Sequence, residues 1–355
     1  MSLGRPGGAI YIASCGDYSD STIILWDAIT YDIVEEWRAE QYDQAYPSVL
    51  EFSPNGELLV TSGVGLGDIE IRNTARPTHS SNNVLSGVHR GRLTHCAWSP
   101  SGTVLASAAA DGSVCLWDLE RYNPLHILMG GHAAPIDVLV ISPSGEWAFS
   151  GGKGCGFSIW RVQTGRLQAL LKDTSGHELH DTPLSVVFDS ESKFVISVHE
   201  DGMVHRWFVQ SGTLYSSTSL QRTHGTAVEA QTLLRAVLSR DGRRVCAVET
   251  HVGGIRNFVS DTFSGSVLWD LDGHCGPVED MVFSRDGKYL ATSSWDCAMR
   301  LWSVNRRRCV ADYTHPSKGL AKNSFAPGGE ILVTGAQDGT VNILDIKDLH
   351  VRYMM

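Results

Sequence analysis

The sequence has little that would tie it to a membrane, a metal or an oxidising compartment. None of its eight cysteines forms a Cys-x-x-Cys pair, so neither a metal knuckle nor a small disulfide scaffold is expected. It contains no Asn-x-Ser/Thr sequon, and no apolar N-terminal segment has the length or pattern of a signal peptide or a membrane span. These absences predict a reduced intracellular setting, with the cytoplasm as the default, and no membrane partner.

Positive charge is also scarce. The chain has 29 Lys and Arg against 39 Asp and Glu, for a net charge of −10. Nucleic-acid binding needs a concentrated positive face, so we expect no nucleic-acid partner. The one basic run, Arg306–Arg308, is more typical of a solvated loop than of a phosphate-binding patch. Hydrophobic residues make up 42% of the chain, which is enough for a packed core.

A turn signal recurs eight times along the chain. Sequences such as SPNG, SPSG and SRDG end at positions that are 42 to 50 residues apart. Those end positions are Gly8, Gly56, Gly102, Gly145, Ser192, Gly242, Gly287 and Gly329. Such regular spacing predicts eight copies of one supersecondary unit.

A second landmark, most often the Trp of a Leu-Trp-Asp sequence, follows each turn by 15 to 18 residues. It falls at Trp26, Arg72, Trp117, Trp160, Trp207, Phe258, Trp302 and Leu344. Trp269 also belongs to a Leu-Trp-Asp sequence, but it lies 27 residues after its turn. We therefore assign Phe258 to the Trp position and place Trp269 in an outer strand.

The segments between the landmarks have the pattern of strands. In the third repeat, apolar segments at 93–98, 104–107, 114–118 and 125–128 are separated only by tight turns, one of them Asp111-Gly112. Four strands per repeat leave no room for crossover helices, which excludes a parallel α/β fold. A single four-stranded sheet exposes both faces, and stacking around an axis buries them.

With these landmarks the sequence resembles the WD-repeat (WD40) family over essentially its whole length, residues 1–355. The resemblance implies one all-β propeller domain with eight four-stranded antiparallel blades, and a seven-bladed ring is the alternative. Blade 1 would begin at Met1–Gly4 and blade 8 would end at Leu349–Met355, without the strand exchange usual at the seam. We therefore expect either a ring sealed by side chains alone or a chain cut from a longer one.

Four repeats share His, Ser or Thr, Asp and, in three of them, Trp at matching positions. The sets are His89, Ser107, Asp111 and Trp117; His177, Ser197, Asp201 and Trp207; His274, Thr292, Asp296 and Trp302; and His315, Thr334 and Asp338. One such set would suggest a catalytic triad, but an enzyme needs one site rather than one per repeat. The family resemblance implies structural hydrogen-bond networks that pin the strands. We predict no catalytic residues, no cofactor and no metal.

Another group of residues is not required by the scaffold. The resemblance places them on the top face of the propeller, beside the Asp positions of the networks, as candidate partner-binding residues. They are Trp295, His199, Glu200, Gln337, Ala110, His180 and Asp181. An exposed Trp on a rigid rim is a typical hot-spot residue, with packing on a neighbouring loop as the alternative. A predicted extended loop at Val248–Ser264 could also overhang one face.

The function implied by the resemblance is that of a non-catalytic, monomeric scaffold that binds a protein or peptide partner on the top face. Two other functions stay open. The chain could be the sensor or regulatory propeller of a larger protein, or it could bind a small ligand or act as an enzyme through the central channel.

Overall fold

The computed structural model describes residues 2–4, 10–15, 22–30, 32–38, 48–62, 66–74, 83–128, 132, 134–154, 156–171, 183–220, 232–251, 254–315, 319–336, 338–348 and 350–354. This part of the chain is all-β and contains no helix. Its strands form eight four-stranded antiparallel sheets, each built from four consecutive strands. The prediction of eight blades is therefore confirmed, and the seven-bladed alternative is wrong.

The first four blades occupy the first half of the chain. Blade 1 consists of β1 (Ser2–Gly4), β2 (Tyr11–Cys15), β3 (Thr22–Asp27) and β4 (Ile33–Arg38). Blade 2 consists of β5 (Leu50–Phe52), β6 (Leu58–Ser62), β7 (Ile69–Asn73) and β8 (Asn83–Leu85). Blade 3 consists of β9 (Leu93–Trp98), β10 (Val104–Ala109), β11 (Val114–Asp118) and β12 (Asn123–Leu128). Blade 4 consists of β13 (Val138–Ile141), β14 (Trp147–Gly152), β15 (Gly156–Arg161) and β16 (Arg166–Leu171).

The second half of the chain repeats this order. Blade 5 consists of β17 (Pro183–Phe188), β18 (Phe194–His199), β19 (Met203–Phe208) and β20 (Leu214–Ser219). Blade 6 consists of β21 (Leu233–Leu238), β22 (Arg244–His251), β23 (Gly254–Asp261) and β24 (Val267–Asp270). Blade 7 consists of β25 (Val278–Phe283), β26 (Tyr289–Ser294), β27 (Ala298–Ser303) and β28 (Arg308–Thr314). Blade 8 consists of β29 (Leu320–Phe325), β30 (Ile331–Ala336), β31 (Val341–Asp345) and β32 (His350–Met354).

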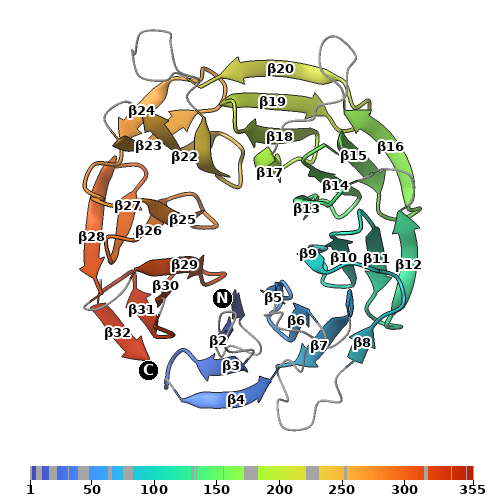
Figure 1. The fold of residues 1–355 in the computed structure, drawn as a ribbon, viewed down its shortest axis with the longest axis horizontal. Coiled ribbons are helices and arrows are strands. Elements are labelled where there is room, and N and C mark those ends of the chain that lie inside the picture. The colour runs from blue at the N-terminus through green and yellow to red at the C-terminus, as the bar shows by residue number, and fades with distance from the viewer. Residues whose placement is uncertain are drawn as a thin grey trace.

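The blades are arranged in a ring, with the first strand of each blade nearest the axis and the fourth strand on the outside (Figure 1). As predicted, Phe258 lies in the third strand of blade 6, and Trp269 lies in its outer strand. Because neighbouring strands run antiparallel, the turns emerge at two opposite ends of the ring. We call the end with the second-to-third-strand turns and the connections between blades the top face, and the other end the bottom face.

The recurring turn between the first two strands requires a left-handed backbone at its last position. The six described glycines there have φ between 66° and 75°, a region that residues with a Cβ atom rarely adopt. Ser192 occupies the same position in blade 5 with φ of 57°. The glycine spacing therefore marked a backbone requirement, and Ser192 meets that requirement at some conformational cost.

The hydrophobic core is divided into eight clusters, one between each pair of neighbouring blades. The inner strands are largely buried because each blade packs both of its faces against neighbouring blades. In β14, for example, all six residues are buried. Burial of apolar surface in this way is the main stabilising term of a repeat ring. A single blade would lose both of its partners and most of this burial.

The ring closes without strand exchange, because blades 1 and 8 are each built from one continuous stretch of chain. Side chains seal the seam: Ile12 and Trp26 of blade 1 share a buried cluster with Val333 and Ile343 of blade 8. On its other side, blade 1 packs closely on blade 2, where a Cβ atom at Gly4 would lie 2.4 Å from the ring of Phe52. Of the two expectations for the seam, the structure has the first, a ring sealed by side chains.

One loop prediction is wrong. The stretch Val248–Ser264 is not an extended loop, because β22 and β23 continue as eight-residue strands paired from Arg244↔Asp261 to His251↔Gly254. Among the described residues of this stretch, those after Asp261 belong to a turn. These are the longest strands of the described chain, and they extend the blade toward the top face.

Candidate functional site

The polar network of blade 3 is a chain of hydrogen bonds that starts at an indole. Trp117 Nε1 donates to Ser107 Oγ at 2.7 Å, and Ser107 Oγ lies 2.6 Å from His89 Nε2. His89 Nδ1 lies 2.5 Å from Ser113 Oγ, which donates to Asp111 Oδ1. With the serine hydroxyls donating in turn, His89 is neutral and carries its proton on Nδ1. Asp111 therefore joins the network through Ser113 rather than directly.

Blade 7 contains the shorter form of the same network. Trp302 Nε1 donates to Thr292 Oγ1 at 2.9 Å, Thr292 Oγ1 lies 2.8 Å from His274 Nε2, and His274 Nδ1 lies 2.9 Å from Asp296 Oδ2. Burial lowers the pKa of His274, although Asp296 partly opposes this effect. Burial alone would raise the pKa of Asp296, but its hydrogen bonds from His274 and two backbone amides lower it overall. All four predicted residues of this set are in contact.

Blade 4 contains a network that was not among the predicted sets. His132 Nε2 lies 2.6 Å from Ser150 Oγ, and Trp160 Nε1 donates to the same oxygen at 2.7 Å. The Asp position, six residues before Trp160, is Gly154. The spacing of 18 residues from His to Ser and 10 from Ser to Trp is the same in blades 3, 4 and 7. That spacing was the feature of the sequence from which the blade 4 network could have been predicted.

The remaining two predicted sets are not assembled in this way. In blade 8, His315 Nε2 lies 3.1 Å from Thr340 Oγ1, which donates to Asp338 at 2.7 Å. Thr334 donates instead to Asn323 Oδ1 at 2.9 Å. Leu344 stands at the Trp position of this blade, and its side chain has no N–H to donate to Thr334.

In blade 5, Ser197 Oγ lies 2.6 Å from Nε2 of His199, and Asp201 accepts the backbone N–H of Met203 at 2.8 Å. Trp207 is fully buried, and its Nε1 has no hydrogen-bond acceptor in the described part of the chain. The predicted link from Ser197 to Trp207 is therefore not formed. His177 lies outside the described residues.

Trp295 stands out among the candidate partner-binding residues. It lies in the turn between β26 and β27 on the top face, and 59% of its surface is exposed. Its Nε1 donates to Glu279 Oε2 at 3.0 Å, and Glu279 Oε1 lies 2.7 Å from Arg235 Nη2 of blade 6. Sequence reasoning did not identify Glu279 or Arg235. Both belong to first strands, at the inner edge of their blades.

The other candidates are distributed around the same face. Ala110 is exposed and Glu200 half-buried, each in the turn between the second and third strands of its blade. His199 is not available to a partner, because it is buried with 1% exposure and engaged with Ser197. Gln337, His180 and Asp181 lie outside the described residues.

A family model adds an independent finding to this geometry. The WD domain, G-beta repeat model matches residues 80–118, 265–303 and 307–345. The first two of these segments contain the complete networks of blades 3 and 7. The chain is a WD-repeat propeller. Each matched segment begins just before the outer strand of one blade and ends with the third strand of the next blade. The WD repeat is therefore offset from the blade by one strand.

Several curated proteins are similar to this WD-repeat chain. A periodic tryptophan protein 2 homolog of Dictyostelium discoideum is 30% identical over 324 residues, which cover 88% of this chain and 30% of that protein. A guanine nucleotide-binding protein subunit beta of Arabidopsis thaliana is 26% identical over 307 residues, which cover 82% of this chain and 77% of that protein. The chain spans less than a third of the length of the periodic tryptophan protein 2 relatives.

A solved structure gives the same fold. The crystal structure of the computationally designed Ika8 protein superposes with a TM-score of 0.70, covers 97% of this chain and 95% of its own, and is 19% identical. At that identity the likeness concerns the propeller fold alone.

The chemistry of the WD-repeat networks is that of hydrogen bonding within blades. The histidines of blades 3 and 7 are held at both ring nitrogens, and burial lowers the pKa of His89 as it does that of His274. Within the described residues no three His, Cys, Asp or Glu side chains are grouped as metal ligands would be. No described helix has the length and apolar character needed to cross a membrane.

Proposed function

We propose that this WD-repeat propeller is a non-catalytic, monomeric scaffold that binds a peptide or protein partner on its top face. The observation that carries the proposal is Trp295, a large aromatic side chain that is 59% exposed and yet held in one position by its bond to Glu279. Because Arg235 holds Glu279 in turn, little conformational freedom remains to be lost when a partner packs against the indole. Aromatic side chains of this kind supply much of the binding energy at protein interfaces.

Other observations support the same function. The curated relative from Arabidopsis thaliana is named as a subunit of a guanine nucleotide-binding protein, which implies that a related propeller works within an assembly. The recurrent His and Ser or Thr pairs are engaged within their own blades, which supports a structural role for them over one catalytic centre. The seven described cysteines are free thiols, which fits an intracellular, reducing setting.

A binding comparison of two exposed aromatic residues tests the proposal. Partners captured by the full chain would be identified by mass spectrometry, and the affinity of each would be measured for wild type, Trp295→Ala and Phe263→Ala. Phe263 is the matched control, since it is 60% exposed but lies in a bottom-face turn of blade 6. A hot-spot residue predicts a loss of about thirtyfold or more for Trp295→Ala.

For a partner of the top face the control variant should bind within about twofold of wild type, and melting temperatures would establish that both variants fold. If every verified partner binds Trp295→Ala as tightly as wild type, the top-face site at Trp295 is wrong.

A further inference from the structure

Two turns on the bottom face carry the same sequence, Ser-Arg-Asp-Gly, at residues 239–242 and 284–287. In each turn the Ser hydroxyl donates to the Asp carboxylate, at 2.6 Å from Ser239 to Asp241 and at 2.7 Å from Ser284 to Asp286. Each Asp also accepts the backbone N–H two residues later, at 3.1 Å. The Asp side chains thus fold back onto their own turns, and the Arg between Ser and Asp stays exposed.

The two exposed arginines line one pocket. Arg240 of blade 6 and Arg285 of blade 7 line a hollow of about 300 Å³ between the bottom-face turns of blades 4 to 7. The rest of its lining is Arg244, Asp241, Asp286, Gly287, Pro143 and Ser190, and each Asp is bonded to its own turn. Burial, and then the nearby charge of Arg285, lower the pKa of Arg240. No described carboxylate lies within 4 Å of the three guanidinium groups. We call this hollow the arginine pocket; it brings together three guanidinium groups that form no ion pair with a described residue.

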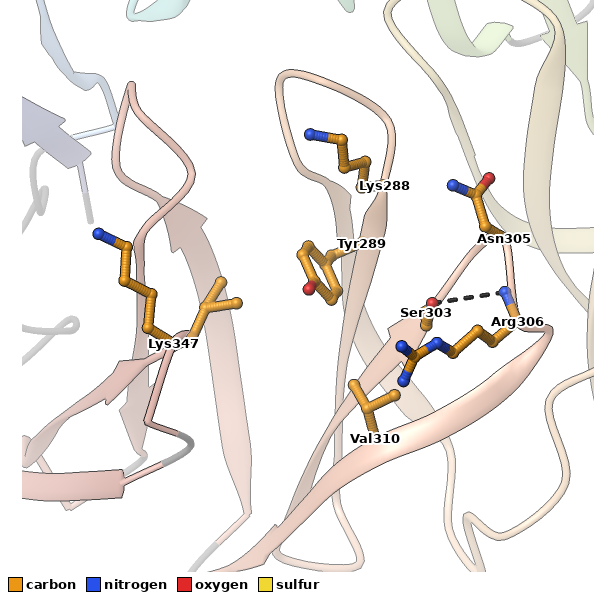
Figure 2. Close-up of a pocket in the computed structure, with 8 residues that line it drawn as sticks. Lys288, Tyr289, Ser303, Asn305, Arg306, Val310 and Lys347 are labelled. Carbon is orange, nitrogen blue, oxygen red and sulfur yellow. Dashed lines mark hydrogen bonds between the residues drawn. The ribbon is translucent and has the colours of Figure 1, made fainter.

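A second basic pocket lies on the other side of the same turn. Lys288, Arg306 and Lys347 line a hollow of about 270 Å³ between blades 7 and 8 (Figure 2). Figure 2 shows Tyr289 between Lys347 on one side and Arg306 on the other, with Lys288 above it and Val310 below it. Lys288 is paired with Asp286 at 2.9 Å, whereas no ion pair of Arg306 or Lys347 is formed with a described residue. We call this hollow the lysine pocket.

The positive charge is local to this sector of the ring. The bottom-face turns of blades 6 to 8, at 239–244, 261–266, 284–288, 303–308, 326–331 and 345–348, contain nine Lys and Arg and six Asp and Glu. The whole chain has the opposite balance, 29 Lys and Arg against 39 Asp and Glu. An acidic protein that gathers almost a third of its cations in six short turns has a surface suited to an anionic ligand.

We propose that the bottom face of blades 6 to 8 binds a phosphorylated peptide segment of a protein partner, with the phosphate in the arginine pocket. A phosphate dianion offers three acceptor oxygens, which match several guanidinium groups better than a single carboxylate does. The lysine pocket receives an acidic side chain that flanks the phosphorylated residue. Asp286 and Gly287 line the arginine pocket and the next residue, Lys288, lines the lysine pocket, so one extended peptide reaches both pockets, and a free phosphate ion is too small to do so. The net charge of −10 disfavours a long polyanion such as nucleic acid.

Fluorescence anisotropy with the full chain tests this site. The probe is a short synthetic peptide with one phosphoserine between glutamates, compared with the same peptide carrying unmodified serine. The variants are the double substitution Arg240→Ala/Arg285→Ala, the single substitution Lys347→Ala, and Arg243→Ala as the matched control. Arg243 is exposed in the same turn as Arg240 but does not line either pocket.

The expected result is that wild type binds the phosphopeptide about tenfold or more tightly than the unmodified peptide, and that the double variant loses this preference. Lys347→Ala should weaken binding by about threefold, and Arg243→Ala should stay within about twofold of wild type. Inorganic phosphate should displace the peptide. Trp295→Ala should leave phosphopeptide binding unchanged, which keeps this site distinct from the top-face proposal.

Three results would overturn the inference. Wild type could fail to bind the phosphopeptide, or Arg243→Ala could weaken binding as much as the double variant does, which would indicate a diffuse electrostatic effect. An RNA oligonucleotide or vesicles of anionic lipid could also bind more tightly than the phosphopeptide with the same dependence on Arg240 and Arg285, and the partner would then not be a peptide.

Discussion

Blades 3 and 5 have the same strand order and the same buried Ser and Trp, yet their interiors are held in different ways. In blade 3, Ser107 joins Trp117 to His89. In blade 5, Ser197 is engaged with His199, and no described acceptor receives the indole N–H of Trp207. The fold of a blade is therefore compatible with two different partners for the buried Ser hydroxyl among the described residues.

Aromatic contacts connect the described residues of blade 5. The ring of His199 lies 5.5 Å from that of Phe157 in blade 4 and 5.0 Å from that of His205, and His205 lies 5.3 Å from Trp207. His199 follows Ser197 by two positions and shares its face of the strand, where blade 3 has Ala109. The comparison teaches that a polar side chain on the second strand can engage the hydroxyl which, in blade 3, joins the Trp to the His.

The same substitution in the two blades should expose this difference most strongly. Ser107→Ala removes the partner of both His89 Nε2 and Trp117 Nε1, so we expect the free energy of unfolding to fall by about 2–3 kcal/mol. Ser197→Ala removes one described hydrogen bond and should cost about 1 kcal/mol. Urea denaturation followed by tryptophan fluorescence measures both values.

Both serines are fully buried, so solvent access does not distinguish them. Ser217→Ala on the exposed side of β20 is the control and should leave stability within about 0.5 kcal/mol of wild type. Equal losses for Ser107→Ala and Ser197→Ala would mean that the network of blade 3 adds nothing beyond a buried hydroxyl.

The ring itself could be predicted because two markers, the turn glycine and the Trp position, depend on local backbone and packing requirements that recur in every blade. The networks of blades 3 and 7 followed from the same regularity. The hydrogen bonding in blade 5 could not be predicted in this way, because the contact of Ser197 with His199 depends on which side chain fills the space beside the hydroxyl. The full length of strands β22 and β23 was missed because the sequence Gly253-Gly254 is typical of a loop. In the structure the two strands stay paired as far as His251 and Gly254.

The basic pockets on the bottom face also required the structure. Arg240 and Arg285 lie 45 residues apart, which is one repeat length, and only the stacking of blades 6 and 7 brings their turns to one pocket. The identical Ser-Arg-Asp-Gly sequences were the available signal. Their spacing was used to count repeats, and the arginines within them were not compared.

The Asp residues of the two blades offer a smaller test. Asp111 accepts hydrogen bonds from the backbone of Arg90 and from both the backbone and hydroxyl of Ser113, whereas among the described residues Asp201 accepts one, from Met203. Asp111→Ala should therefore lower the free energy of unfolding by about 1–2 kcal/mol, and Asp201→Ala by about 0.5 kcal/mol. The same denaturation measurement applies, and a larger loss for Asp201→Ala would contradict the comparison.

The pH dependence of stability gives the smallest and most selective test. Burial lowers the pKa of His89 below its unfolded value near 6.5, although Asp111 partly opposes this effect. Below about pH 6.5 His89 takes up a proton in the unfolded chain but not in the folded chain, so the free energy of unfolding falls as the pH decreases from that point.

His89→Gln removes this contribution, and melting temperatures measured between about pH 7.5 and 5 should then decline less steeply than those of wild type. His126→Gln on the outer strand β12 is the matched control and should keep the wild-type slope. Equal slopes for wild type and His89→Gln would show that the histidine of the blade 3 network is not held in its neutral form.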